Sequence, residues 1–193
     1  DARADPGRAE TPGTERVTMR FSLLLIDSGI APETVAVILH TAKEPGLRNK
    51  LGTLFQDEPE LFDAYQSTHN PQAEATLRGR QVAASFVSGS GTDMTFVGLY
   101  DVTSWEHWSA ERLDADPLFT TLRDRYGTTT FATSVNVADR AGRLRFQLTR
   151  RAELDDLTGR LVIERPAGRS YVRLAERMAD EVKEVLRRPH LSP

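Results

Sequence analysis

The sequence of 193 residues contains no cysteine. This absence excludes disulfide bonds, thiolate zinc ligands and a cysteine nucleophile, and it fits a reducing cytoplasm. Long apolar runs are also absent, because no stretch approaches the roughly 18 residues of a membrane-spanning helix. The N-terminal residues lack the apolar centre of a signal peptide. We therefore expect a cytoplasmic protein that does not associate with membranes.

Motifs typical of metal sites and enzymes are missing as well. Four histidines occur, and none has the close spacing of paired metal ligands: His40, His69, His107 and His190. The Gly-rich segment at 88–93 contains neither G-x-S-x-G nor G-K-[ST], and it leads into a strand rather than a helix. Acidic pairs such as Asp155-Asp156 are adjacent residues that cannot face each other across a substrate. We predict no catalytic residue, no metal and no cofactor, and an enzyme is the less favoured class.

The overall composition is that of a globular domain, with 39% hydrophobic and 27% charged residues. A domain of this size buries enough surface to fold without disulfides or metals. Residues 1–18 mix Pro, Gly, Thr and charges without apolar periodicity, which predicts a disordered tail. Residues 189–193 follow the last periodic segment and are expected to fray. The pattern therefore predicts a single domain over residues 19–188.

Helical spacing dominates the first part of this domain. Leu47, Leu51 and Leu54 recur at i, i+4 and i+7, which predicts one apolar helix face. In contrast, 35–39 is a run of five β-capable apolar residues and predicts a buried strand. Helices are predicted at 21–26, 47–55, 59–68 and 70–79.

The pattern changes to strands from Gln81 onward. Segments 82–87 and 94–102 flank the Gly-rich loop and predict a hairpin. Further strands are predicted at 128–137, 143–149 and 159–164, and helices at 104–126 and 171–188. This order predicts an α+β fold, with a curled, mainly antiparallel sheet or a small β-barrel, N-terminal helices and a C-terminal helix. A PUA-like arrangement is one candidate.

Charge is distributed unevenly around a net value of −3. Residues 81–139 contain 3 basic and 8 acidic side chains, whereas residues 140–193 contain 13 basic side chains, 12 of them arginine, and 8 acidic ones. Arginine is the side chain best suited to forked contacts with phosphates or bases. Two interpretations stay open: a surface that binds a polyanion, or a solvated helix of mixed charge.

Three stretches carry a recognisable pattern. The first is HTAKEP at 40–45 followed by LFDAYQST at 61–68. The second is VAASFV at 82–87 with FVGLYDV at 96–102. The third is LRFQL at 144–148 with LTGRLVI at 157–163 and RSY at 169–171. In this order and at these separations, residues 20–175 resemble the N-terminal region of a bacterial family of GIY-YIG nuclease proteins.

The GIY and YIG strands that give the nuclease domain its name do not occur in this sequence. The resemblance therefore implies a front module that selects a nucleic-acid target without cutting it. It implies a modified or unusual target, DNA rather than RNA, in a restriction or defence setting, and a separate nuclease as a partner. The third stretch departs from the family, which has aromatic residues where Arg165, Val172 and Leu174 stand here.

The resemblance and the predicted sheet suggest two sets of candidate residues. A curled sheet can hold one flipped base that stacks on aromatic rings and is hydrogen-bonded along its edge. The candidates for such a pocket are His40, Tyr65, Gln66, Phe86, Tyr100, Trp105 and Trp108. The candidates for phosphate contacts are Arg143, Arg145, Arg150, Arg151, Arg169 and Arg173.

Structural roles for these residues and other functions for the chain stay open. Phe86 is typical of a core residue, a Trp can simply cap the sheet, and Tyr65 and Gln66 can fix a helix against it. The same pocket would also suit a small-molecule binding or self-resistance protein. A small enzyme that uses His40 and nearby acids is the third possibility.

Overall fold

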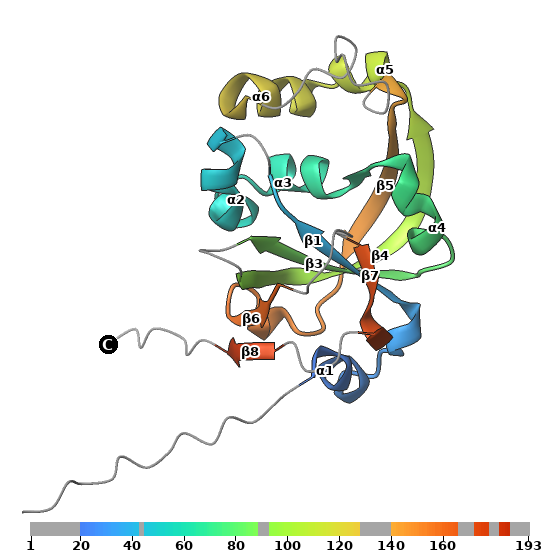
Figure 1. Ribbon diagram of the computed structural model, residues 1–193, viewed down its shortest axis with the longest axis vertical. Helices are drawn as coiled ribbons and strands as arrows, with labels where there is room; N and C mark the ends of the chain where they lie inside the picture. Colours follow the sequence, from blue (N-terminus) through green and yellow to red (C-terminus); the bar gives the residue numbers. More distant parts are fainter. Residues whose placement is uncertain are drawn as a thin grey trace, which may run out of the picture.

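A computed structural model describes residues 20–42, 45–88, 93–127, 140–165, 172–177 and 182–185. Within these residues, eight strands form one strongly curled sheet, and helices cover its two faces (Figure 1). The fold is α+β, and the sheet is mixed but mainly antiparallel, which confirms the predicted class. Of the predicted segments, the tail at 1–18, the strand at 128–137 and the end at 189–193 lie outside the described residues.

The N-terminal elements follow the sequence prediction closely. Strand β1 is fully buried, as expected for five consecutive β-capable apolar residues. Helix α3 begins at Pro59, whose fixed backbone angle suits the first helical turn. The predicted third helix after Asn70 is short and starts as a 3-10 turn. In chain order the elements are α1 Phe21–Asp27, η1 Pro32–Thr34, β1 Val35–His40, α2 Pro45–Asp57, α3 Pro59–Gln66, β2 Thr68–His69, η2 Pro71–Ala73 and α4 Glu74–Leu77.

The sheet is built around one parallel pair. Strand β3 (Val82–Ser88) lies parallel to β1, and the chain crosses from one to the other through α2, α3 and α4. The other pairs are antiparallel, and the strand order is β2-β5-β4-β3-β1-β7, with β6 against β4 and β8 against β6. The helical crossover therefore places α2 and α3 over one face of the sheet.

Strand β4 (Asp93–Trp108) is longer than predicted and corrects the helix expected at 104–126. Its first part pairs with β3 and β6, and its second part pairs with β5 as far as Trp108. Residues 103–107 are exposed, so they lack the apolar alternation that marks a half-buried strand. Pairing with β5 outweighs their polar composition. Helices begin only after Trp108, as α5 Ala110–Asp114 and α6 Pro117–Tyr126.

The C-terminal helix predicted at 171–188 is wrong for the described residues of that segment. Val172 pairs with Ile38, so β7 fills the free edge of β1, and β8 does the same for β6. Backbone groups at a sheet edge need partners that a helix cannot supply. The strands at 143–149 and 159–164 are confirmed. The elements here are β5 Arg143–Arg150, η3 Asp155–Leu157, β6 Leu161–Glu164, β7 Val172–Leu174, η4 Ala175–Arg177 and β8 Val182–Val185.

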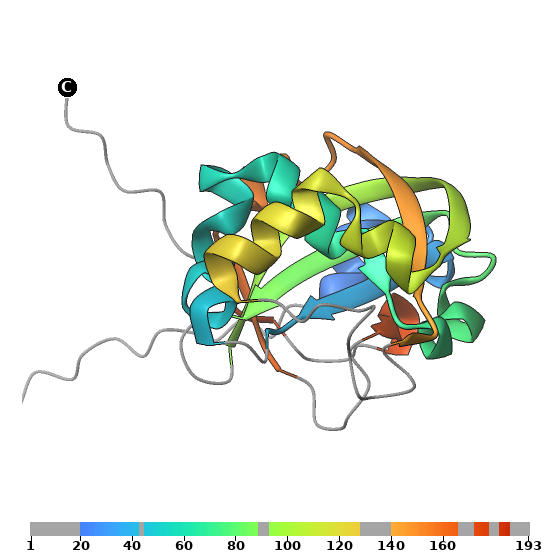
Figure 2. The ribbon, with the colours of Figure 1, turned by 90° about the horizontal axis from the view of Figure 1, so that it is seen from above.

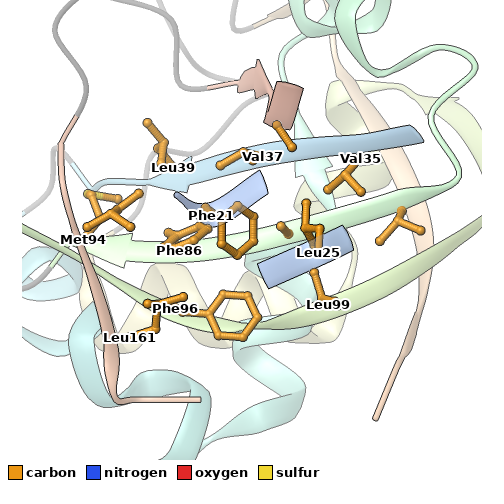
Figure 3. Close-up of a cluster of buried hydrophobic side chains, with 14 of the residues drawn as sticks. Phe21, Leu25, Val35, Val37, Leu39, Phe86, Met94, Phe96, Leu99 and Leu161 are labelled. Atoms are coloured by element: carbon orange, nitrogen blue, oxygen red, sulfur yellow. The ribbon is translucent and has the colours of Figure 1, made fainter. Parts of the chain in front are cut away.

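One face of the sheet packs against α1 and forms an aromatic core. Phe21 of α1 lies 5.2 Å from Phe86 of β3, and Phe86 lies 5.3 Å from Phe96 of β4, measured between ring centroids (Figure 3). All three rings are completely buried. Phe86 is therefore a core residue here, on the face of the sheet that α1 covers.

The opposite face carries α2, α3 and α6, and α4 covers its end (Figures 1 and 2). Leu47, Leu51 and Leu54 point from α2 into this second core, as their spacing predicted. Beyond α3 the sheet curls, so that β5 and the last residues of β4 rise away from the main core (Figure 1). This projecting ribbon and α3 border the surface described next.

The position of Phe86 yields a stability prediction. Phe86→Ala removes a ring that two other rings enclose, and we expect it to lower the free energy of unfolding by about 3–5 kcal/mol. Urea unfolding followed by circular dichroism measures the change. Leu23→Ala on the exposed side of α1 is the control and should stay within about 0.5 kcal/mol. A Phe86→Ala protein as stable as the parent would contradict this assignment.

Candidate functional site

A chain of polar side chains crosses the core between β1, β3 and α3. The Ser85 hydroxyl donates a hydrogen bond to the side-chain oxygen of Gln66 over 2.7 Å, and His40 Nε2 lies 3.4 Å from the same hydroxyl. Ser85 and Gln66 are completely inaccessible to solvent. Buried polar groups need such partners, because an unpaired one costs about 1–3 kcal/mol. The residues are therefore held in one arrangement.

This chain of polar side chains reaches the surface at Asp63. The Gln66 side-chain nitrogen donates to Asp63 Oδ1 over 2.6 Å, while Asp63 itself is exposed. Partial desolvation raises the pKa of the Asp63 carboxyl above its ordinary value. Since Gln66 is bonded at both ends, it fixes the orientation of this carboxyl group from inside the protein.

Four of the predicted pocket residues lie together at this face, and two of them flank the chain of polar side chains. Tyr65 donates its hydroxyl proton to the carbonyl oxygen of Thr41 over 3.0 Å. Tyr100 is 4% exposed, and its hydroxyl accepts a hydrogen bond from Arg150 over 3.2 Å. His40 and Gln66 complete the group. The structure thus brings these four together, but as buried supports rather than as an open pocket.

The arrangement of Ser85 and His40 does not support nucleophilic catalysis. A nucleophilic serine donates its proton to the base beside it. Here the Ser85 proton goes to Gln66, and Ser85 and His40 are both buried. The polar chain is suited to positioning Asp63.

The open surface beside this chain contains two adjoining pockets. The tryptophan pocket, about 430 Å³, is lined by Ser104, Trp105, Glu106, Trp108, Arg145, Phe146 and Gln147. The aspartate pocket, about 290 Å³, is lined by Glu60, Asp63, Ala64, Ser67, Leu118, Arg145, Phe146 and Leu148. Arg145 and Phe146 belong to both. Together the pockets form a groove between α3 and the ribbon of β4 and β5.

Arg145 is the central cation of this groove. Its Nη1 donates to the Ala64 carbonyl oxygen over 2.7 Å and to Thr68 Oγ1 over 2.9 Å, and it also bonds Ser67. Its guanidinium carbon lies 5.2 Å from the Trp108 ring centroid. Among the described residues no carboxylate lies within 4.0 Å of it, and desolvation lowers its pKa. The guanidinium is therefore anchored but not neutralised by an ion pair there.

The two tryptophans differ in their contacts and in their exposure. Trp108 Nε1 donates to Glu106 Oε1 over 2.5 Å, and the guanidinium of Arg112 lies over its ring at 3.9 Å. Gly142 also approaches it closely, because a Cβ at this position would lie 2.1 Å from the Trp108 carbonyl oxygen. Trp105 extends from the opposite side of the ribbon, where the guanidinium of Arg78 lies 5.2 Å from its ring centroid, and it remains 38% exposed. The side chain of Trp108, and not that of Trp105, therefore shares the face of the ribbon that carries Arg145.

The other predicted arginines lie elsewhere. Arg150 forms an ion pair with Asp155, and Arg151 forms ion pairs with Asp101 and Glu153. Arg143 is only 8% exposed and donates to the Gly142 carbonyl oxygen. Arg173 lies in β7 opposite Val37, and Arg169 is outside the described residues. Among the members of this set that the structure describes, only Arg145 lies in the groove.

Sequence reasoning missed the acid that completes the groove. Asp63 lies three residues before Gln66 on α3, a spacing that puts both on one helix face. That spacing was the available signal. Gln147, on β5 in the tryptophan pocket, was also missed, because its partner segment 104–108 was predicted to be helical.

No protein-family model matches the chain, and no curated protein or solved structure is significantly similar to it. The resemblance to the front region of GIY-YIG nuclease proteins therefore stays a prediction. Among the described residues, no group of three or more potential ligands could hold a metal ion. No helix in the described part of the chain is long and apolar enough to cross a membrane.

The buried histidines predict a pH dependence of stability. Burial, together with the charge of His69, lowers the pKa of His40 to about 3, and burial lowers the pKa of His69 to about 3, both from an ordinary 6.5. The unfolded chain therefore binds protons that the folded chain does not. The free energy of unfolding should fall as pH drops below 6.5, by up to about 1.4 kcal/mol per pH unit for each ring.

Urea unfolding between pH 7 and pH 5 measures this slope with little interference from carboxylates. The double variant His40→Gln with His69→Phe should show a much flatter dependence. An equally steep slope in the double variant would contradict the assignment of the proton uptake to these two rings.

Proposed function

We propose that this chain is a non-catalytic nucleic-acid recognition module that seats an unpaired base in the tryptophan pocket. The observation that carries the proposal is the Arg145 guanidinium, which has no carboxylate partner in the described residues and lies beside the Trp108 ring in the tryptophan pocket. Bases stack on aromatic rings regardless of sequence, and arginine adds charge and hydrogen-bond donors.

The dimensions and the lining of the pocket support this proposal. A volume of about 430 Å³ lies within the range of small-ligand sites. Ser104 and Gln147 supply neutral donors and acceptors at its wall, which can contact a base edge. The preference for DNA, the modified target and the separate nuclease partner rest on the resemblance of residues 20–175, not on the groove.

The charges around the groove limit how the nucleic acid is held. Because Arg150 and Arg151 are paired with acids, they add little attraction for a phosphate backbone. The proposed mode is therefore recognition of one or two nucleotides rather than a polycationic grip on a long strand.

A second candidate function is binding of a small aromatic metabolite. The carboxylates of Glu60 and Asp63, which form no ion pair with the described residues, line the same groove and would repel a long polyanion. Free nucleosides and nucleotides that bind as tightly as oligonucleotides would favour this alternative.

Tryptophan fluorescence gives a direct test of the tryptophan pocket. The chain has two tryptophans, and both line this pocket. A stacked base should quench their emission when single-stranded oligonucleotides are added at low salt. Trp108→Ala should weaken binding by about 5- to 100-fold, as expected for the loss of one stacking contact, whereas Trp105→Ala, on the opposite side of the ribbon, is the control and should weaken it less.

Trp105→Phe leaves Trp108 as the single reporter and should retain quenching, whereas Trp108→Phe leaves a reporter on the opposite side of the ribbon and should lose most of it. A folded parent protein with no quenching by any single-stranded DNA, RNA or nucleotide would overturn the proposed site.

The salt dependence of the binding affinity distinguishes a site with one cation from a basic surface with several. If Arg145 is the only cation in contact with the bound strand, affinity for a single strand should fall only about threefold between 50 and 200 mM salt, whereas six arginine contacts would give a fall of several hundredfold. Arg145→Gln should abolish most binding. Arg150→Gln, the same change on the same strand, should alter affinity less than about twofold because its charge is already paired. Equal losses in the two variants would contradict the assignment.

A further inference from the structure

The aspartate pocket presents two opposite charges that do not form an ion pair with each other. Asp63 and Arg145 both line it, and no salt bridge joins Asp63 to any described residue. Leu118, Leu148 and Phe146 provide apolar walls. At about 290 Å³, the space is suited to one flat ring system. A ligand here would meet a hydrogen-bond acceptor and a donor fork at separate points.

Both charged groups are held in place by the protein. Asp63 Oδ1 accepts a hydrogen bond from the Gln66 side-chain nitrogen, and the Ser85 hydroxyl donates to the oxygen of the same amide group. Asp63 Oδ2 makes no hydrogen bond to the described residues. Arg145 is anchored through Nη1 alone. Its Nε and Nη2 form the side-on fork of the guanidinium and make no hydrogen bond to the described residues. The two free edges are the pre-oriented part of the pocket.

Among the bases, guanine has the arrangement of hydrogen-bond donors and acceptors that fits these two charged groups. Guanine has two adjacent donors, N1–H and the N2 amino group, and the acceptors O6 and N7 on the neighbouring edges. Arginine commonly reads O6 and N7 of guanine with its fork. A carboxylate can accept both N1–H and N2–H. In thymine and uracil the single ring N–H is flanked by two carbonyl oxygens, which a carboxylate repels.

We propose that the aspartate pocket is a guanine-reading subsite, in which Asp63 accepts the N1–H and N2–H donors and Arg145 donates to O6 and N7. This inference rests on the proposed function, because it places the guanine next to a base stacked in the tryptophan pocket. Asp63 is then the residue that determines specificity, and Gln66 and Ser85 are positioning residues behind it.

A set of nine-nucleotide single strands tests the subsite. Each is oligo-dT with one central substitution: guanine, adenine, cytosine, hypoxanthine or 7-deazaguanine. Affinity is measured by tryptophan quenching of the full chain and checked by fluorescence anisotropy. Guanine should bind about 5- to 100-fold more tightly than thymine. Hypoxanthine, which lacks the N2 amino group, and 7-deazaguanine, which lacks N7, should each lose a large part of this gain.

Variants assign the preference to individual groups. Asp63→Asn replaces one acceptor oxygen with a donor and should abolish the preference of guanine over hypoxanthine, while binding of oligo-dT persists through the tryptophan pocket. Asp124→Asn removes an equal charge from α6 outside both pockets and should keep the full preference. Ser85→Ala frees the Gln66 amide and should reduce the preference partly, with unchanged binding of oligo-dT.

The outcomes separate this inference from the proposed function. Equal affinity for all five substituted strands and oligo-dT, with strong quenching, would overturn the guanine subsite and leave the tryptophan pocket standing. A guanine preference that survives Asp63→Asn would also overturn it. Loss of quenching by every strand would contradict both. Tighter binding of free guanosine monophosphate than of any strand would favour the small-molecule alternative.

Discussion

The fold depends on β4 remaining paired over its whole length while it changes partners. Its first residues are bonded to β3 and β6, and its last residues are bonded to β5, with a register shift at Val102/Ser104. A strand without partners would leave a row of backbone groups unsatisfied. Because β5 supplies the partners, β4 can extend beyond the apolar core as an exposed ribbon. That extension is what places tryptophan rings, which ordinarily occupy interiors, on a surface that a ligand can reach.

The helix-covered face carries a polar connection through the core to the same surface. Gln66 on α3 is bonded to Ser85 on β3 and to Asp63 one helical turn earlier. Apolar contacts alone would allow α3 some rotation against the sheet, whereas a fully satisfied buried amide specifies one position. The desolvation of Gln66 is offset by these two bonds. The same contacts that fix α3 therefore also fix the carboxyl group at the groove.

The sequence predicted the elements that are set by local patterns and missed those set by distant partners. The apolar run predicted the buried strand β1, and the spacing of Leu47 and Leu51 predicted the buried face of α2. A core position for Phe86 was the structural alternative to its place in a pocket, and the ring is buried. Residues 104–108 were predicted to be helical because residues 103–107 are exposed and lack apolar alternation, and only pairing with β5 makes them a strand. At the C-terminal end, β7 forms because the edge of β1 is open there. Neither fact is encoded within the segment itself.

At the candidate site too, the number of arginines in the sequence and the contacts of each arginine in the structure lead to different conclusions. Twelve arginines among the last 54 residues suggested a basic surface, yet the charge of an arginine is available to a ligand only when no acid already holds it. Arg150 and Arg151 lie on or just after β5 and are paired with acids, while Arg145, earlier on the same strand, is held by neutral oxygens and aromatic rings. A desolvated guanidinium held in this way gains most from an acceptor that enters the groove beside it. The selectivity that we propose, for a ring with acceptors on its edge, follows from that imbalance, and a uniformly basic face would not provide it.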